Sequence, residues 1–435
     1  MTSENLDSNL PNEITNYDDL NYATLTDALE QTVFENFDDG LYIGMMSGTS
    51  LDGMDAALCQ FSSSEDDIST PMKLLATYSQ DFSPHLREVL LALCQPNGVK
   101  DLVSQDDEPK SELDWFGWAS REYGEFASEV VNTLLQQSNI DADSVLAIGC
   151  HGQTVRHRPQ MGFSLQLLDA NIIAERTAIS VVSDFRRRDM AVGGQGAPLV
   201  PAFHNALFAD PNHARVLLNL GGIANITILS ATVANKEIKK QVVGYDTGPA
   251  NLLLDAWAKQ HIDKEYDAGG AWAQSGQVVE PLLNQLLEHS FFAQSYPKST
   301  GREDFNLDWL QAELQKFDQA STATRYSVAD VQATLTELTA ISACDQINGL
   351  ISNKENSSVY VCGGGASNSY LMTRLQAPLP HCKVETTASL GLEPTWVEAV
   401  AFAWLARQTL MGETSNLPAV TGAHKGVVLG QVCFA

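Results

Sequence analysis

Small and hydroxyl-bearing residues gather in the segment GTSLDGMD at positions 48–55, between the apolar runs LYIGMM and MDAALCQF. This pattern predicts a β-hairpin whose turn can direct several backbone N–H groups at an anion. The glycines permit close approach, the hydroxyls can donate hydrogen bonds, and the aspartates could hold hydrated Mg2+. The candidate phosphate ligands are Gly48, Thr49, Ser50, Leu51, Asp52, Gly53, Met54 and Asp55. An ordinary polar hairpin turn is the competing interpretation of this segment alone.

Two further glycine turns follow apolar strands. The run VLLNL leads into GGIAN at 221–225, and VYVC leads into GGGASN at 363–368, where Ser367 or Asn368 is expected to cap a helix. The candidate nucleotide contacts in these turns are Gly221, Gly222, Asn225, Gly363, Gly364, Gly365 and Asn368. None of the turns matches the P-loop or the dinucleotide fingerprint. Their layout resembles the two phosphate loops and the adenosine loop of the sugar kinase, Hsp70 and actin superfamily, which implies ATP as the ligand.

Charged side chains also follow apolar strands, where α/β proteins place their ligand-binding groups. Asp184 ends the run SVVSDF and is the candidate general base, with helix capping or an ion pair to the adjacent arginines as the alternative. His151 follows the run SVLAIG and is either a ligand contact or a structural histidine. Asp246 lies in the turn-like segment GYDTGPAN, and Glu337 lies on a predicted helix. Arg186 begins the only dense basic run, which suits a bound anion or a structural ion pair.

The elements that would position these residues alternate between strands and helices, which indicates an α/β fold with hairpins added to parallel sheets. Helices are predicted at 112–137, 251–260, 279–292, 331–348 and 394–411. The unit of strand, glycine turn and strand occurs twice, and each unit would open one lobe. With the superfamily resemblance, this predicts a two-lobed actin-like ATPase fold with a central nucleotide cleft. We expect an acidic, disordered extension at 1–40 and lobes at 41–212 and 213–435.

Composition narrows the classes of function. A chain of 435 residues suits two domains. Its 26 Lys and Arg against 54 Asp and Glu give a formal net charge of -28, which disfavours nucleic acid and anionic membranes as partners. No run approaches the length of a membrane helix and no signal peptide opens the chain, so we expect a soluble, cytoplasmic protein. The seven cysteines show no CxxC spacing, which argues against a disulfide framework or a structural zinc site.

Eight segments in order along residues 41–435 resemble the anhydro-N-acetylmuramic acid kinase family: GMMSGTSLDGMD, CHGQTVRHRP, SDFRRRDMAVGGQGAPLVP, LNLGGIANIT, GYDTGPANLLLD, STGREDFN, TLTELTA and CGGGASN. The resemblance implies an ATP- and Mg2+-dependent enzyme that opens 1,6-anhydro-N-acetylmuramic acid with water and phosphorylates O6, in bacterial cell-wall recycling. It implies that Asp184 activates the water and that Glu337 contacts the sugar or this water. His151, Asp246 and Arg186 are the further candidates for substrate contacts, and a homodimer is also implied. The ligands of Mg2+ stay unassigned.

Two other hypotheses stay open on the residues alone. The same fold could phosphorylate another anhydrosugar or an ordinary hexosamine, and only segments 150–159 and 184–201 favour the muramic acid derivative. A protein of a different class would use ATP to gate a partner, as Hsp70 and actin do. It would need a peptide-binding domain or a polymer surface, and the chain has no residues left over for the former.

Overall fold

The computed structural model describes residues 37–48, 51–62, 72–102, 109–231, 242–320, 325–351 and 356–435. The expected acidic extension lies outside the described residues except for positions 37–40. Thr49 and Ser50, two of the candidate phosphate ligands, also lie outside them.

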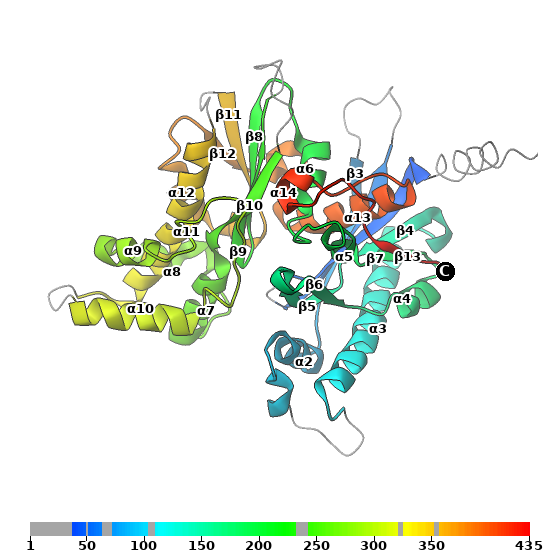
Figure 1. Ribbon diagram of the computed structural model, residues 1–435, viewed down its shortest axis with the longest axis horizontal. Coiled ribbons are helices and arrows are strands. Elements are labelled where there is room, and N and C mark those ends of the chain that lie inside the picture. Colours follow the sequence, from blue (N-terminus) through cyan, green and yellow to red (C-terminus); the bar gives the residue numbers. More distant parts are fainter. Residues whose placement is uncertain are drawn as a thin grey trace, which may run out of the picture.

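Within these ranges the strands form two mixed sheets, one in each lobe, and a separate hairpin (Figure 1). The first sheet has the order β13-β7-β4-β1-β2-β3, with β1 (Gly40–Met46), β2 (Gly53–Phe61), β3 (Met72–Asp81), β4 (Val145–Cys150), β7 (Val181–Ser183) and β13 (Gln431–Cys433). The second has the order β10-β9-β8-β11-β12, with β8 (Ala214–Leu220), β9 (Ile223–Leu229), β10 (Val242–Pro249), β11 (Ser357–Cys362) and β12 (Lys383–Thr386). The hairpin pairs β5 (Gln153–Arg158) with β6 (Phe163–Leu167). The predicted two-lobed α/β fold is confirmed.

Both predicted hairpins are present, and each joins a parallel strand. In the first sheet β1 pairs antiparallel with β2 and parallel with β4. In the second, β8 pairs antiparallel with β9 and parallel with β11. Because parallel strands end at the same edge of a sheet, each glycine turn lies beside the end of a parallel strand. His151 therefore follows β4 beside the first turn, and Gly363 follows β11 beside the second.

Helices cover the sheets, and those predicted from the sequence are present with small shifts of their ends. Two of them, α3 (Glu112–Ser138) and α11 (Val328–Leu350), begin with capping boxes built from Ser111 and Ser327. The other helices of the first lobe are α2 (Pro84–Cys94), α4 (Ala170–Thr177) and α5 (Phe185–Met190), whereas α6 (Val200–Phe208) packs against β9 and β10 of the second sheet and against α13. The remaining helices are α7 (Asn251–Ile262), α8 (Ala271–Ser275), α9 (Glu280–Leu287), α10 (Leu307–Ala320), α12 (Ser369–Gln376), α13 (Val397–Leu410) and α14 (Pro418–Thr421).

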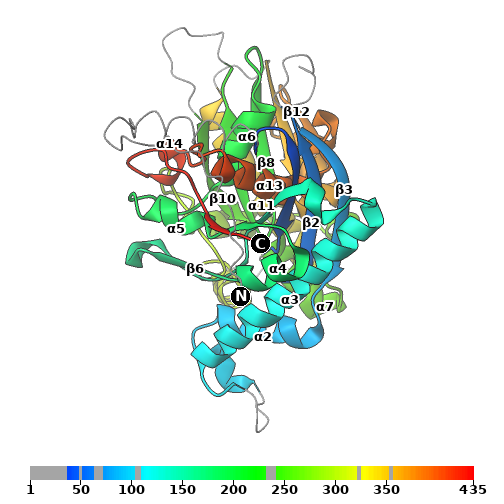
Figure 2. The same ribbon diagram turned by 90° about the vertical axis from the view of Figure 1, so that its right-hand side faces the viewer.

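The first sheet buries both of its faces, because successive side chains of a strand point to opposite sides. In β1, Ile43 and Met45 join a core with residues of α2, α3 and α4, whereas Tyr42 joins a core with residues of α13. Figure 2 shows α3 and α4 on the near side of this lobe. The core that contains Tyr42 also includes Leu217 and Tyr360 of the second sheet, so it links the two lobes.

The end of the chain returns to the first sheet, which differs from the expected assignment of all of 213–435 to the second lobe. Helix α13 packs on β1, β4 and β2, and β13 pairs antiparallel with β7. Gly44 of β1 and Gly149 of β4 are paired neighbours, and the backbone of α13 lies close against both. A Cβ atom at Gly44 would lie 1.8 Å from the carbonyl oxygen of Ala399, and one at Gly149 would lie 2.0 Å from that of Phe402. Only glycine allows this contact between helix backbone and sheet.

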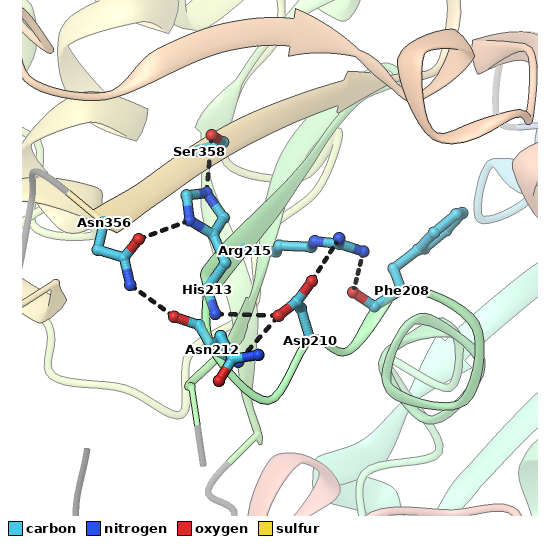
Figure 3. A network of polar contacts seen from close by, with 7 residues as sticks. All are labelled: Phe208, Asp210, Asn212, His213, Arg215, Asn356 and Ser358. Carbon is cyan, nitrogen blue, oxygen red and sulfur yellow. Dashed lines mark hydrogen bonds and ion pairs between the residues drawn. The ribbon is translucent and has the colours of Figure 1, made fainter. Parts of the chain in front are cut away.

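A polar network lies at the start of β8 and β11, at the opposite ends of these strands from the glycine turns (Figure 3). The two ring nitrogens of His213 contact Asn356 Oδ1 and Ser358 Oγ, each at 3.0 Å. Arg215 donates to Asp210 Oδ2 and to the Phe208 carbonyl oxygen, each at 2.9 Å. These contacts join the two strands where they enter the sheet.

Two further predictions concern membrane helices and disulfide bonds. Among the described helices, none is long and apolar enough to cross a membrane. None of the seven cysteines, which all lie in described segments, forms a disulfide bond, and five of them are buried.

Candidate active site

The first glycine turn is held by one cation from α2. Arg87 donates from Nε to the Leu51 carbonyl oxygen at 3.0 Å and from Nη2 to Asp52 Oδ1 at 3.2 Å. The backbone N–H of Phe82 donates to the Asp52 carbonyl oxygen at 2.9 Å. Leu51 and Met54 are almost completely buried in the core, so their side chains are not available to a ligand. Asp55 lies in β2 and accepts a hydrogen bond from Ser79 Oγ at 2.7 Å.

The second glycine turn is held by the start of α7. The backbone N–H groups of Ala250 and Asn251 donate to the carbonyl oxygens of Gly222 and Gly221 at 3.0 and 3.1 Å. Asn251 Nδ2 donates to the Leu220 carbonyl oxygen at 3.0 Å. Asn225, expected in this turn, lies inside β9 instead, where it pairs with one residue of β8 and one of β10.

The third glycine turn packs directly against the second. A Cβ atom at Gly363, whose φ is +78°, would lie 2.4 Å from Asn219 Oδ1, and one at Gly365 would lie 2.5 Å from Leu220 Cβ. Gly364 is open by contrast, because its nearest such neighbour would be Asn251 Nδ2 at 3.7 Å. Asn368 caps α12 by accepting from the Leu371 N–H at 3.0 Å, as one of the two expected caps.

The charge of Asp52 in the first turn acts on Asp255 in α7. Burial, followed by the charges of Asp52, Asp267 and Glu265, raises the pKa of Asp255 to about 7. Asp52 belongs to the first turn, whereas the others belong to α7 and the segment after it. The sequence analysis missed Asp255, although it lies in the quoted segment GYDTGPANLLLD.

Asp184 is the N-cap residue that precedes α5, and it immediately follows β7. Its φ of 55° and ψ of 49° place it in the left-handed region, which Asp tolerates better than most residues and which is frequent at functional sites. Its side chain makes no capping hydrogen bond. It accepts instead from Arg187 Nε at 2.7 Å, so the ion pair with an adjacent arginine is present. The Asp184 side chain is 14% exposed, against 57% for Arg187.

His151 is buried and pairs with Arg186, which is partly buried and lies two residues after Asp184. Arg186 donates to His151 Nε2 from Nε at 3.1 Å and from Nη2 at 2.9 Å, and it donates from Nη1 to the Gly196 carbonyl oxygen at 2.8 Å. Burial lowers the pKa of Arg186 to about 10, while the charges of Glu398 and Asp246 oppose this shift. The pair therefore lies within electrostatic reach of α13 and of β10 in the second sheet.

Asp189 is linked to this pair through Gly196, whose N–H donates to Asp189 and whose carbonyl oxygen accepts from Arg186. Asp189 was not among the residues predicted from the sequence. Its carboxylate is fully buried and accepts from the Gly196 N–H at 2.8 Å and from Asn416 Nδ2 and Thr421 Oγ1, each at 2.7 Å. Asn416 and Thr421 belong to the returning end of the chain. No local sequence signal points to Asp189, because its two side-chain partners lie far along the chain.

Asp246 holds a loop of the second lobe. It lies in β10 rather than in a turn, and its Oδ2 accepts from Ser299 Oγ at 2.8 Å and from the Thr300 N–H at 3.0 Å. Burial raises the pKa of Asp246 to about 6, although these two hydrogen bonds and Arg186 oppose the rise. Lys298 of the same loop is also buried, with its Nζ 4.5 Å from the Phe291 ring centroid.

Glu337 lies on α11, as predicted, but it is not an exposed helical residue. It is 6% exposed, and its Oε2 accepts from Arg374 Nε of α12 at 2.5 Å. Glu398 in the first turn of α13 is a further missed carboxylate. Burial raises its pKa, and Arg186 and Asp55 act on it in opposite directions. The structure thus joins His151 to Arg186 by hydrogen bonds, and the charges of Asp246 and Glu398 act on Arg186.

Comparison with known proteins assigns the family. The model of the family "Anhydro-N-acetylmuramic acid kinase" matches residues 40–435. A relative of that name from Psychrobacter cryohalolentis is 79% identical, covering 96% of this chain and 100% of its own length. Another from Psychrobacter arcticus is 77% identical, covering 96% and 100%. A ROK family glucokinase from Streptomyces griseus, solved with glucose and AMPPNP, aligns with a TM-score of 0.38 at 14% identity, over 85% of this chain and 100% of its own. The chain belongs to the anhydro-N-acetylmuramic acid kinase family.

Proposed function

We propose that this protein is an ATP-dependent kinase that opens 1,6-anhydro-N-acetylmuramic acid with water and phosphorylates O6. The products are N-acetylmuramic acid 6-phosphate and ADP, and the role is recycling of cell-wall murein in the bacterial cytoplasm. The observation that carries the proposal is family membership over residues 40–435.

Asp184 is the proposed general base. It takes a proton from a water molecule as the water oxygen attacks C1 of the sugar. The bond between C1 and O6 breaks, and O6 takes the γ-phosphoryl group of ATP. The position of Asp184 at a strand end and its left-handed backbone support this role. Arg187 is exposed, and ion pairs with solvent-exposed partners contribute little free energy. Water can therefore replace Arg187 as the partner of the Asp184 carboxylate.

The glycine turns are the proposed nucleotide site. The first and second turns would bind phosphates through backbone N–H groups, and the third would lie against the adenosine. The close packing of Gly363 and Gly365 on the end of β8 supports this. It leaves no room for a Cβ at either position, so no side chain of these residues covers the backbone of the turn. Phosphoryl transfer depends mainly on such positioning and on charge neutralisation.

Mg2+ fits the carboxylates near the first turn. Among the described residues, no three His, Cys, Asp or Glu side chains form a preformed metal site. Mg2+ at nucleotide sites is commonly held by one or two carboxylates together with phosphate oxygens. Asp52 and Asp255 would supply this pair, and the raised pKa of Asp255 indicates a carboxylate that lacks a counter-charge. Bound there, Mg2+ would neutralise negative charge on the phosphates.

The test is a product assay in 18O-labelled water with ATP, Mg2+ and 1,6-anhydro-N-acetylmuramic acid, comparing the natural protein with Asp184→Asn. We expect a 6-phosphorylated product labelled at C1, and a rate at least about 100-fold lower in the variant, since general bases contribute 10²–10⁴-fold. ATP affinity should be unchanged. ATP consumption without a sugar product would reject the proposed substrate.

Substrate choice and assembly need their own measurements. Levoglucosan and N-acetylglucosamine replace the substrate in the same assay, and faster turnover of either would favour the alternative sugar kinases. We also propose a homodimer. Light scattering should give twice the mass of one chain, and a monomer mass would contradict this part.

A further inference from the structure

His151 lies where the first sheet meets the region between the lobes. It follows β4, and its backbone N–H donates to the Met45 carbonyl oxygen at the end of β1, just before the first glycine turn. Its ring lies 4.8 Å from the ring of Phe402 on α13. The residue is only 4% exposed. Its contacts are therefore fixed by β1, α13 and α5.

Arg186 determines which nitrogen of His151 carries the proton. An arginine side chain has donors and no acceptor, so His151 Nε2 must accept both hydrogen bonds from Arg186. The proton of the neutral ring then lies on Nδ1. Burial, followed by the charge of Arg186, holds the pKa of His151 well below its usual value, although the Gly152 backbone opposes this. The ring is therefore neutral near pH 7, with one donor.

This donor makes no well-formed hydrogen bond. Among the described residues, the Gly152 backbone lies close enough to act on the ring, but His151 Nδ1 is buried without a partner in hydrogen-bond geometry. A buried donor without an acceptor costs about 1–3 kcal/mol, so native proteins rarely keep one without a function. Arg186 is held in turn by the Gly196 carbonyl oxygen, so the orientation of the ring is set by protein contacts alone.

We propose that His151 Nδ1 donates a hydrogen bond to an oxygen of the sugar substrate, and that Arg186 is a positioning residue that fixes this tautomer. The inference rests on the proposed function, because it takes the sugar as the ligand. It separates the roles of two residues that the sequence analysis treated alike. His151 contacts the sugar, and Arg186 acts through His151.

Calorimetry of sugar binding in the presence of a non-hydrolysable ATP analogue tests the contact. His151→Phe removes the donor, whereas His151→Asn keeps an N–H at the place of Nδ1. We expect sugar affinity to fall about tenfold in His151→Phe, as for one lost hydrogen bond. His151→Asn should recover most of the loss, and affinity for the ATP analogue should not change. Unchanged sugar affinity in His151→Phe, or equal weakening of both ligands, would overturn the proposal.

His213→Asn is the matched control. Both ring nitrogens of His213 have partners in the network at the far ends of β8 and β11 (Figure 3). Its sugar affinity should stay within about twofold of the natural protein, a change well below that of one lost hydrogen bond. A loss as large as in His151→Phe would show that any buried histidine gives this effect, which would overturn the assignment.

A pair of sugars identifies the acceptor oxygen. Anhydro-N-acetylmuramic acid carries a lactyl carboxylate, and anhydro-N-acetylglucosamine lacks it. A larger loss in His151→Phe for the muramic acid derivative would assign the carboxylate, and equal losses would assign an oxygen that both sugars share. If the natural protein binds neither sugar, the proposed function fails, and with it the ligand assigned to His151.

The role of Arg186 is tested without substrate. Nitrogen-15 NMR of labelled histidine should show His151 with protonated Nδ1 and bare Nε2 in the natural protein. In Arg186→Met this preference should be lost. A protonated Nε2 in the natural protein, or an unchanged tautomer in the variant, would overturn the positioning role even if the proposed function holds.

Discussion

The two sheets contribute to the candidate site in different ways. The first supplies a side-chain set: His151 and Arg186, which are joined by hydrogen bonds, and Asp184, which is paired with Arg187. The second supplies a backbone set, the glycines at 221, 222 and 363–365, where neighbouring atoms leave little room for a Cβ at Gly363 and Gly365. Chemistry that moves protons needs titratable groups, whereas phosphate binding needs exposed N–H groups. The comparison predicts that damage to each set has a different kinetic signature.

Asp189→Asn should have the largest effect, and it should act through the side-chain set. The substitution removes a buried carboxylate that accepts three hydrogen bonds, so we expect unfolding free energy to fall by about 2–3 kcal/mol. Because Gly196 also accepts from Arg186, kcat should fall while the KM for ATP stays constant. Chemical denaturation and steady-state kinetics measure both.

Asp210→Asn is the control for this prediction, because it removes a carboxylate from the network far from the glycine turns (Figure 3). It should lower stability with no change in kcat. Equal losses of kcat in both variants would break the distinction between the side-chain set and the rest of the molecule.

Gly363→Ala should damage the backbone set. The positive φ and the Cβ position 2.4 Å from Asn219 Oδ1 predict a loss of about 1–3 kcal/mol in unfolding free energy. The KM for ATP should rise, with kcat at saturating ATP nearly kept. Gly364→Ala is the matched control, because its Cβ has room, and its effect should stay within about 0.5 kcal/mol. Similar effects of the two substitutions would show that packing does not shape this turn.

Asp255→Asn should change how stability depends on pH. The raised pKa of about 7 means that the Asp255 carboxyl is protonated more readily in the folded protein than in the unfolded chain. The stability this contributes is present at low pH and is lost as pH rises toward 7. The stability of the variant relative to the natural protein should therefore increase as pH rises from 4 to about 8, because the natural protein loses the contribution of the protonated carboxyl over this range. Thermal unfolding across this range measures it, and a constant difference would reject the pKa.

Asp255 also sharpens the comparison through Mg2+. If it holds the ion with Asp52, activation by Mg2+ should strengthen as pH rises through about 7 in the natural protein, following its pKa. Asp255→Asn should require more Mg2+ at every pH. Identical Mg2+ titrations would remove Asp255 from the proposed metal site.

Local patterns were sufficient to predict the secondary structure around the site. The hairpins at β1–β2 and β8–β9 follow from apolar runs joined by glycine turns, and α3 and α11 were predicted with small shifts of their ends. Asn225 was wrongly placed in a turn, because β9 begins two residues earlier than the end of the glycine-rich segment. Strand ends are not determined by composition alone.

By itself, the sequence determined the α/β class, the glycine turns and the family, because these depend on residues close together in the chain. Tertiary structure alone decided that α13 lies on the first sheet, since this contact needs Gly44 and Gly149 to meet a helix about 250 residues or more away. It also decided the tautomer of His151 and the partners of Asp189, which come from distant segments. A hydrogen bond depends on distance and direction in space, and neither can be read from spacing along the chain.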